Sequence, residues 1–168
     1  MSERAEFLMK GQALLATPFH YTASGLDNVY LLNGVVIDDT SYGSMVNIKN
    51  LNGLHHAIGL HIIEKTEPMT GPEFRFLRKQ MELTQAELAE AMRTTDQTIA
   101  NYETGKTEAL GPADPYMRFL YTLEIVPDET KAELLKMYME RLGRSDGARL
   151  PDIPRRKLVQ QWGERKAA

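Results

Sequence analysis

The chain has 168 residues, of which 42% are hydrophobic and 26% are charged, and its formal net charge is −3. This length supports one ordinary domain or two small ones with a real hydrophobic core. The absence of cysteine excludes disulfides and thiolate metal sites and is typical of a reducing compartment. No apolar run approaches the roughly 18 residues of a membrane span, and the acidic N-terminus lacks a signal-peptide core, so we expect a cytoplasmic protein.

The charge is unevenly distributed along the chain. Residues 1–70 contain 4 Lys/Arg and 7 Asp/Glu, whereas residues 141–168 contain 8 Lys/Arg and 3 Asp/Glu. The body is therefore acidic and the tail basic. Any contact with nucleic acid must come from a few well-placed side chains and from the tail, because the protein as a whole has no positive field.

The N-terminal part predicts a small α+β unit. Residues 3–16 favour a short amphipathic helix, interrupted by a glycine. Two apolar runs, 29–32 and 35–37, flank Asn33 and Gly34. Because Asn-Gly suits a two-residue turn in which both residues have positive φ, this stretch predicts a β-hairpin.

A second turn at residues 42–44 precedes a predicted third strand over residues 45–49. A helix follows over residues 51–64, with Asn52 as its expected cap. One face of this helix carries apolar residues and a histidine at helical spacing, namely Leu54, Ala57, Ile58, His61 and Ile62.

Residues 66–72 form a turn-rich connector, and Thr70 or Gly71 before Pro72 marks a good helix start. Helical patterns then follow over residues 72–81, 85–92, 96–103, 115–123 and 129–142. A polar linker over 143–154 and a last basic helix over 154–166, around Leu158, Val159 and Trp162, complete the chain.

These elements predict a mostly α protein with a small N-terminal α+β unit. We expect three segments: a small α+β domain over 1–69 with its hairpin and helix, a helix-turn-helix domain over 70–125, and C-terminal helices with a basic tail over 126–168.

The stretch from 84 to 107 carries the functional signal. Thr84 begins a helix, and Glu87 three residues later completes a capping box. Thr95 caps a second short helix, and Gly105 stands where a helix stop with positive φ is needed. The expected inward side chains are Leu88, Ala89, Met92, Ile99 and Tyr102, and the expected outward ones are Asp96, Gln97, Ala100 and Asn101.

An outward face of short amides and an acid suits the edges of bases in the major groove. Gln and Asn can pair with adenine, and Asp can accept a hydrogen bond from cytosine N4. This segment resembles the helix-turn-helix of the Xre, or lambda-repressor-like, family, especially that of lambdoid phage repressors. The resemblance covers about residues 72–125 and rests on the pattern Thr-Gln-Ala-Glu-Leu-Ala, then Thr-Thr-x-Gln-x-Ile, then Glu-x-Gly-Lys.

The resemblance implies a role for each matched residue. Thr84, Gln85 and Thr95 would donate to phosphates at helix N-termini. The residues facing bases would be Asp96, Gln97, Thr98 and Asn101, and those approaching the next phosphates would be Thr104, Gly105 and Lys106. Arg78 and Glu103 match an Arg–Glu pair that orients the motif in this family.

The sequence departs from the family pattern at two positions. Asp96 stands where the phage relatives tend to have an amide, and its carboxylate should weaken non-specific affinity and sharpen base choice. Arg93 stands in the turn where glycine is usual.

The N-terminal unit is similar to that of MqsA-type antitoxins, in which a zinc domain precedes a helix-turn-helix. The family's Cys-x-x-Cys-Gly aligns with residues 39–43, so Asp39 and Tyr42 replace the ligands and cannot form a tetrahedral thiolate site. Apolar packing by Tyr30, Leu31 and Tyr42 would then replace the metal.

We expect neither a metal site, nor a cofactor, nor enzyme activity. His55 and His56 are adjacent and point to different faces of a helix, and His61 cannot easily join His55. Asp38 and Asp39 are more typical of a turn than of an acid–base pair.

The sequence as a whole predicts a dimeric transcriptional repressor that binds double-stranded operator DNA near its own promoter, with residues 96–103 in the major groove. The alternative is an antitoxin whose N-terminal unit binds a toxin protein, and a small-molecule sensor is a third possibility. The helix over 129–142 either closes the core or forms a dimer surface through Leu134, Leu135, Met137, Tyr138 and Leu142. Arg155, Arg156 and Lys157 either follow phosphates or are solvated.

Overall fold

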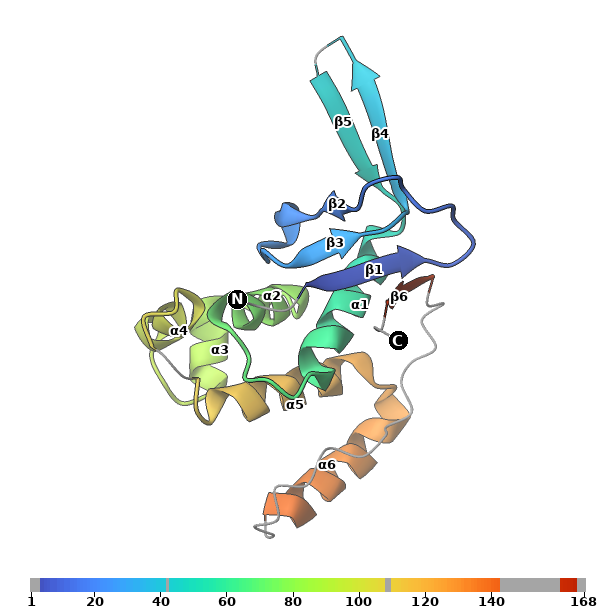
Figure 1. Ribbon diagram of the computed structural model, residues 1–168. Helices are drawn as coiled ribbons and strands as arrows, with labels where there is room; N and C mark the ends of the chain where they lie inside the picture. Colours follow the sequence, from blue (N-terminus) through green and yellow to red (C-terminus); the bar gives the residue numbers. More distant parts are fainter. Residues whose placement is uncertain (1–3, 42, 108–109, 143–160, 166–168) are drawn as a thin grey trace.

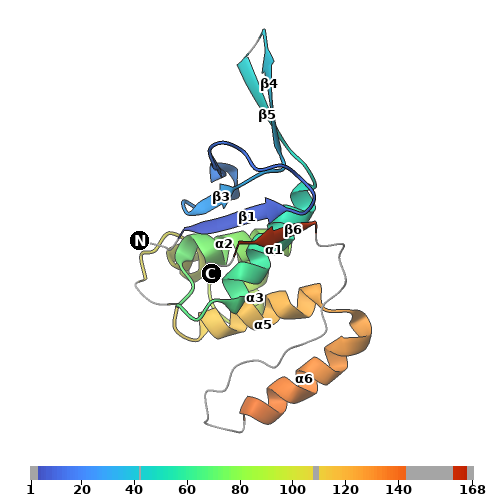
Figure 2. The same ribbon diagram turned by 45° about the vertical axis from the view of Figure 1, so that its right-hand side comes forward.

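The computed structural model describes residues 4–41, 43–107, 110–142 and 161–165. Its helices are α1 (Leu51–Glu64), α2 (Gly71–Gln80), α3 (Gln85–Ala91), α4 (Asp96–Glu103), α5 (Ala113–Ile125) and α6 (Asp128–Leu142). Its strands are β1 (Ala5–Met9), β2 (Phe19–His20), β3 (Val29–Leu31), β4 (Val35–Thr40), β5 (Gly43–Ile48) and β6 (Trp162–Glu164). The β4–β5 hairpin and α6 extend from opposite ends of a body formed by the other elements (Figures 1 and 2). The expected mixture of helices with a small N-terminal α+β unit is confirmed.

The body contains a four-stranded sheet in the order β2-β3-β1-β6. Strand β1 pairs parallel with β3 and antiparallel with β6. The prediction of a helix over residues 3–16 is wrong, because Ala5, Phe7 and Met9 are buried and the residues between them are not. This alternation has a period of two and fits the inner face of a strand.

The prediction of a hairpin around Asn33 and Gly34 is also wrong. Strands β3 and β4 belong to different sheets. Gly34 has a positive φ of +70°, whereas Asn33 does not have the positive φ that the expected turn requires. Asn33 is buried instead: its Oδ1 accepts from the Met9 N–H at 2.6 Å, and its Nδ2 donates to the carbonyls of Met9 and Gln12, each at 3.0 Å. These tertiary hydrogen bonds compete successfully with the local turn.

The chain turns back one strand later. Strands β4 and β5 form an antiparallel hairpin that pairs Val35 with Ile48 at its base and Thr40 with Gly43 at its tip. The predicted strand over residues 45–49 is therefore confirmed, although it begins at Gly43; Tyr42 lies outside the described residues.

The predicted C-terminal helix over 154–166 is wrong where the structure describes it. Residues 162–164 form strand β6, and Leu158 and Val159 lie outside the described residues. Trp162 is buried, and its Nε1 donates to the Lys49 carbonyl at 2.8 Å. Its ring lies 2.6 Å from the position that a Cβ on Gly34 would occupy, so the glycine makes room for the indole.

Helix α1 has the predicted bounds but a different cap. Asn50, in a left-handed conformation at φ 48°, accepts a hydrogen bond from the Gly53 N–H at 3.1 Å, so the expectation of Asn52 as the cap is wrong. Of the predicted apolar face, Leu54, Ala57, Ile58 and Ile62 are buried. His61 lies at the border of this face, where its Nδ1 is 2.9 Å from Glu164 Oε1.

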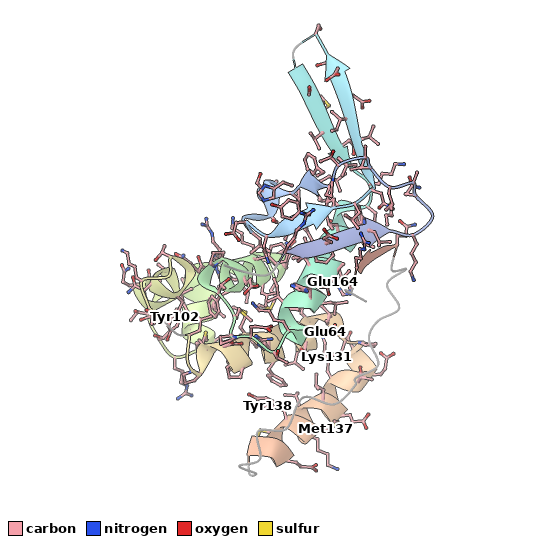
Figure 3. The ribbon with its side chains drawn as sticks, in the orientation of Figure 1. Glu64, Tyr102, Lys131, Met137, Tyr138 and Glu164 are labelled. Carbon is pink, nitrogen blue, oxygen red and sulfur yellow. The ribbon has the colours of Figure 1, made fainter. Side chains whose placement is uncertain are left out.

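The five later helices agree with the predicted ranges within a few residues at each end. Their buried side chains, with those of the sheet and α1, form one contiguous cluster that includes Phe7, Ile58, Phe74, Leu88 and Met117. Helix α6 packs through a smaller cluster, in which Tyr138 stacks on Phe119 of α5 with ring centroids 3.8 Å apart (Figure 3). Within the part of the chain that the structure describes, no helix combines the length and apolar character that crossing a membrane requires.

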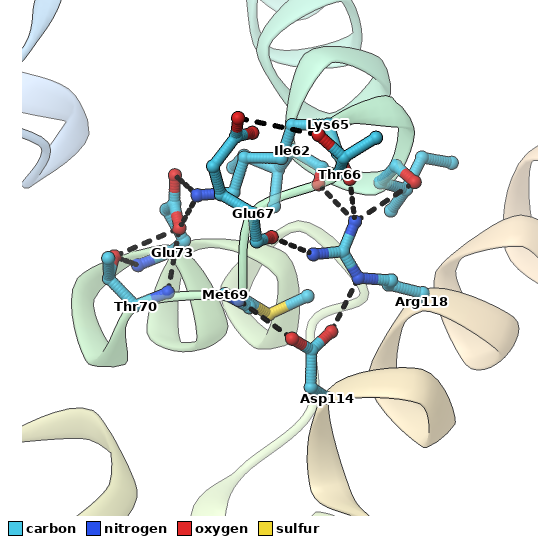
Figure 4. Close-up of polar contacts among 10 residues, drawn as sticks. Ile62, Lys65, Thr66, Glu67, Met69, Thr70, Glu73, Asp114 and Arg118 are labelled. Carbon is cyan, nitrogen blue, oxygen red and sulfur yellow. Dashed lines mark hydrogen bonds and ion pairs between the residues drawn. The ribbon is translucent and has the colours of Figure 1, made fainter. Parts of the chain in front are cut away.

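Arg118 of α5 holds the connector between α1 and α2 (Figure 4). Its Nη1 donates to the carbonyls of Ile62, Ile63 and Lys65, and its Nη2 donates to that of Glu67 at 2.8 Å. Its Nε donates to Asp114, which also accepts from the Met69 N–H at 2.7 Å. One guanidinium therefore satisfies the last carbonyls of α1, which have no partner within the helix.

We predict that Arg118→Ala lowers the free energy of unfolding by about 2–4 kcal/mol, because several part-buried carbonyls lose their donor and Asp114 loses its counter-charge. Arg118→Lys should recover little of this loss, since an ammonium group lacks the planar fork that reaches all of these acceptors. Urea denaturation measures both changes. The control is Arg75→Ala at an exposed position of α2, for which we expect a change below about 1 kcal/mol.

His55 of α1 joins the sheet unit to α2. Its Nε2 lies 2.8 Å from Tyr21 Oη, its Nδ1 lies 3.3 Å from Gln80 Nε2, and its ring meets Phe76 edge-on. Burial lowers the pKa of His55 below its ordinary value, so the folded protein favours the neutral imidazole. In the described residues, no group of three or more His, Asp or Glu side chains is arranged to hold a metal ion.

The lowered pKa predicts a pH dependence of stability. As the pH falls below about 6.5, the unfolded chain takes up a proton at His55 that the folded chain resists, so the free energy of unfolding should fall. His55→Gln lacks this titrating group. As the pH falls from about 7.5 to 5.5, the free energy of unfolding of wild type should therefore decrease more than that of the variant. Denaturation curves across that range test this. Parallel pH profiles of the two proteins would contradict it.

Candidate nucleic-acid interface

Helices α2, α3 and α4 begin in the same way. Each has a threonine at its N-cap whose side chain accepts a backbone N–H three residues later: Thr70, Thr84 and Thr95. In α2 and α3 a glutamate at that third position, Glu73 or Glu87, also accepts from the backbone N–H of the cap. The capping box predicted for Thr84 is therefore confirmed, and the short helices have defined starts.

The same three helices also end alike. Glu82, Arg93 and Gly105 follow the caps of α2, α3 and α4 and have positive φ values of 57°, 51° and 70°. At each end, two backbone hydrogen bonds close a Schellman motif, as in α4, where Gly105 N–H meets the Tyr102 carbonyl and Lys106 N–H meets that of Asn101. Arg93 thus takes the left-handed conformation for which glycine is usual, and the backbone of the turn is preserved.

A buried ion pair joins α2 to the end of α4. Arg78 Nε and Nη2 donate to the two carboxylate oxygens of Glu103, and Nη1 donates to the Leu83 carbonyl at 2.7 Å. Gln85 Nε2 donates to the same carboxylate at 2.9 Å. Although burial by itself raises the pKa of Glu103, hydrogen bonds from Arg78 and Gln85 outweigh it and hold that pKa below its ordinary value. The orienting pair expected of Arg78 and Glu103 is present.

Close packing supports this arrangement beneath α4. A Cβ on Gly71 would lie 2.4 Å from the Tyr102 carbonyl oxygen, so only glycine lets the start of α2 approach the end of α4 so closely. Ile99 is fully buried, and Tyr102 meets Phe74 of α2 edge-on. Figure 3 shows Tyr102 on the side of the body that carries α4. The inner face of α4 is thereby fixed to α2 and α3.

The opposite face of α4 is open to solvent. Asp96 and Gln97 are exposed, and Thr98 and Asn101 are half-buried. Gln97 Nε2 donates to Asn101 Oδ1 at 3.1 Å, so the two amides lie side by side one turn apart. Since an amide has two donor hydrogens and one acceptor oxygen, this pairing leaves the Asn101 Nδ2 donors and the Gln97 carbonyl for a ligand.

The residues expected to meet phosphates lie around this face, and several of them already have partners. The Thr84 hydroxyl donates to Glu87, and the Thr104 hydroxyl donates to the Ala100 carbonyl at 2.8 Å. Thr95 Oγ1 lies 2.9 Å from Thr98 Oγ1. Lys106 is exposed directly after the end of α4.

Sequence reasoning missed two features of this site. Gln85 was expected to bind phosphate, and its contact with Glu103, 18 positions later, has no signal in local spacing. Gly71 was considered only as a helix start, although its close approach to α4 is the stronger constraint.

A helix-turn-helix family model matches residues 74–110, which contain all of α3 and α4 and all of α2 except its first three residues. No curated protein and no solved structure matches the chain. The match agrees with the capped, ion-paired three-helix unit described above and with the resemblance to Xre and lambda-repressor-like proteins. The chain therefore contains a helix-turn-helix, the DNA-binding unit of transcriptional regulators.

We predict that Glu103→Ala lowers the free energy of unfolding by about 3–5 kcal/mol, because it leaves the buried guanidinium of Arg78 without its counter-charge. The double variant Arg78→Met/Glu103→Leu should regain most of this loss, since it removes both charges and fills the space with apolar groups. Urea denaturation of the three proteins measures this. A double variant no more stable than Glu103→Ala would show that the pair is not the cause.

Proposed function

We propose that this protein is a sequence-specific transcriptional regulator that binds double-stranded DNA as a dimer and represses transcription near its own promoter. The observation that carries the proposal is the amide pair of exposed Gln97 and half-buried Asn101, on a helix held from beneath by the Arg78–Glu103 pair. The helix-turn-helix match supports it. A rigid helix whose outer amides keep donor and acceptor groups available is what the major groove can accept.

The amide pair favours adenine as one recognised base. Adenine presents the N7 acceptor and the N6 donor in the major groove. The Asn101 Nδ2 group can donate to N7, and the Gln97 carbonyl oxygen, one turn away, can accept from N6. Asp96, at the exposed start of α4, would accept from cytosine N4, and its negative charge would oppose binding where no such donor is present.

Phosphate contacts would position α4 in the groove. The proposed contacts come from Thr84, Gln85, Thr95, Thr104 and Lys106, which lie at the ends of α3 and α4. At the starts of these helices, the first backbone N–H groups have no partner within the helix and point outward, which suits an anion. Such contacts set position and register but do not choose sequence.

We predict that Asn101→Ala weakens binding to the operator by about 1–3 kcal/mol and relaxes the preference at one base position. The operator is first obtained by sequencing DNA fragments that the pure protein captures. Affinities for the operator and for scrambled DNA are then measured at one salt concentration, because phosphate contacts depend strongly on salt.

The matched control is Asn52→Ala, the same substitution at an exposed position of α1, which should leave both affinities unchanged. Equal losses on operator and scrambled DNA would show that Asn101 does not select a base.

A further inference from the structure

The β4–β5 hairpin projects from the body (Figures 1 and 2), and most of its residues are exposed. Four of its apolar side chains are exposed: Val36 by 37%, Ile37 by 54%, Met45 by 62% and Val46 by 44%. An isolated two-stranded ribbon is only marginally stable in water. A ribbon that exposes this much apolar surface marks a surface for a protein contact.

The strand register distributes these side chains over both faces of the ribbon. Ile37 pairs with Val46, so these two share one face, which continues from the pair Val35 and Ile48 that packs against the body. Val36 and Met45 lie on the other face because side chains alternate along each strand. A partner laid on one face would therefore leave the other apolar face exposed, whereas a partner at the edge contacts side chains of both faces.

The two edges of the ribbon differ in charge. Strand β4 carries Asp38 and Asp39, whereas the six residues of β5 carry no charge. Exposed edge strands are normally protected from pairing by charged side chains, proline or bulges. Strand β5 contains no lysine, arginine, acid or proline, and in the described part of the chain β4 is its sole hydrogen-bonded neighbour.

The charge of the ribbon also selects the kind of partner. Residues 35–48 contain two acids and no lysine or arginine, so the ribbon is repelled by a phosphate backbone. An uncharged strand suits a second copy of itself, because antiparallel pairing about a two-fold axis places the same residues on both sides without like charges meeting. Pairing through β4 would instead bring the acids of both copies together.

We propose that two copies of this chain pair through their β5 edges, antiparallel and about a two-fold axis, to form a four-stranded sheet in the order β4-β5-β5-β4. The inference deepens the proposed function and rests on it, because a dimeric operator requires a two-fold protein. The arrangement places Asp38 and Asp39 on the two outer strands, where the acids of the two copies are farthest apart. It also joins Val46 and Met45 of each copy into apolar contacts across the new strand pair.

Sedimentation equilibrium of the full chain tests the pairing. We predict that Met45→Lys raises the dimer dissociation constant by about tenfold or more, since it places a charge on the β5 edge. Met45→Ile, an apolar strand former that keeps the apolar contacts across the strand pair, should leave the dissociation constant within about threefold of wild type. Circular dichroism and thermal melting confirm that both variants fold, which is expected because Met45 is exposed.

The matched control distinguishes the β4–β5 hairpin from α6, which also exposes apolar side chains, Leu135 by 44% and Met139 by 66%. Met139→Lys is the same substitution on that helix and should leave the dimer intact. If Met139→Lys dissociates the dimer and Met45→Lys does not, the dimer forms through α6 and the inference is overturned. A wild-type protein that stays monomeric at all concentrations would also overturn it.

Cross-linking provides a second readout, because the chain has no cysteine of its own. Single cysteines placed in turn at positions 44, 45, 46 and 47 should give one maximum of disulfide-linked dimer under mild oxidation, at the residue nearest the two-fold axis. Val36→Cys on β4 should give little. The two β4 strands would be separated by three strand spacings, about 14 Å, whereas a disulfide requires Cα atoms within about 7 Å. Equal yields from β4 and β5 would contradict the proposed pairing.

The two proposals fail separately. Asn101→Ala should lose operator affinity and keep the wild-type dimer, whereas Met45→Lys should lose the dimer and keep binding to non-specific DNA. A cross-linked dimer that selects no DNA sequence would overturn the proposed function alone. If the protein binds its operator selectively and all of its β5 variants stay dimeric, the proposed β5 pairing alone is overturned.

Discussion

The position of α4 depends on a buried ion pair between α2 and the end of α4. Arg78 donates two hydrogen bonds to Glu103 and a third to the Leu83 carbonyl, and Glu103 also accepts one from the Gln85 amide. Charges removed from water must be paired, so α2, the turn after it, the start of α3 and the end of α4 are held in one geometry. The outer amides of α4, Gln97 and Asn101, consequently lie on a fixed helix.

A second polar network transmits this geometry to the N-terminal half. Arg118 binds the last carbonyls of α1 and the connector that leads to α2. Strand β5 runs through Asn50 directly into α1, and α1 packs against α2 and α5. A dimer formed through β5 would therefore set the separation of the two α4 helices through a continuous path of packed elements. Two recognition helices that read half-sites one turn of DNA apart require such a path.

The charge distribution favours selective over indiscriminate binding. The protein has a net charge of −3, and α4 itself begins with an exposed aspartate. Non-specific affinity for DNA comes from Lys and Arg side chains that neutralise phosphates, and the surface around α4 offers few of them. In the proposed complex, recognition through the paired amides and one carboxylate would contribute a larger share of the binding free energy, and the acidic hairpin would be repelled by the phosphate backbone.

Local sequence was sufficient for the helices around the site, and tertiary contacts decided the rest of the fold. Thr70, Thr84 and Thr95 lie beside the ends of the helices that they cap, so spacing alone identifies α2, α3 and α4. By contrast, residues 5–9 form a strand because β3 and β6 pair with it, and Asn33 leaves its expected turn because Met9 binds its side chain. The strand at Trp162 depends on Lys49, more than a hundred residues earlier. Capping and helical periodicity act within one or two turns, whereas strand pairing and buried hydrogen bonds join residues whose proximity exists only once the chain has folded.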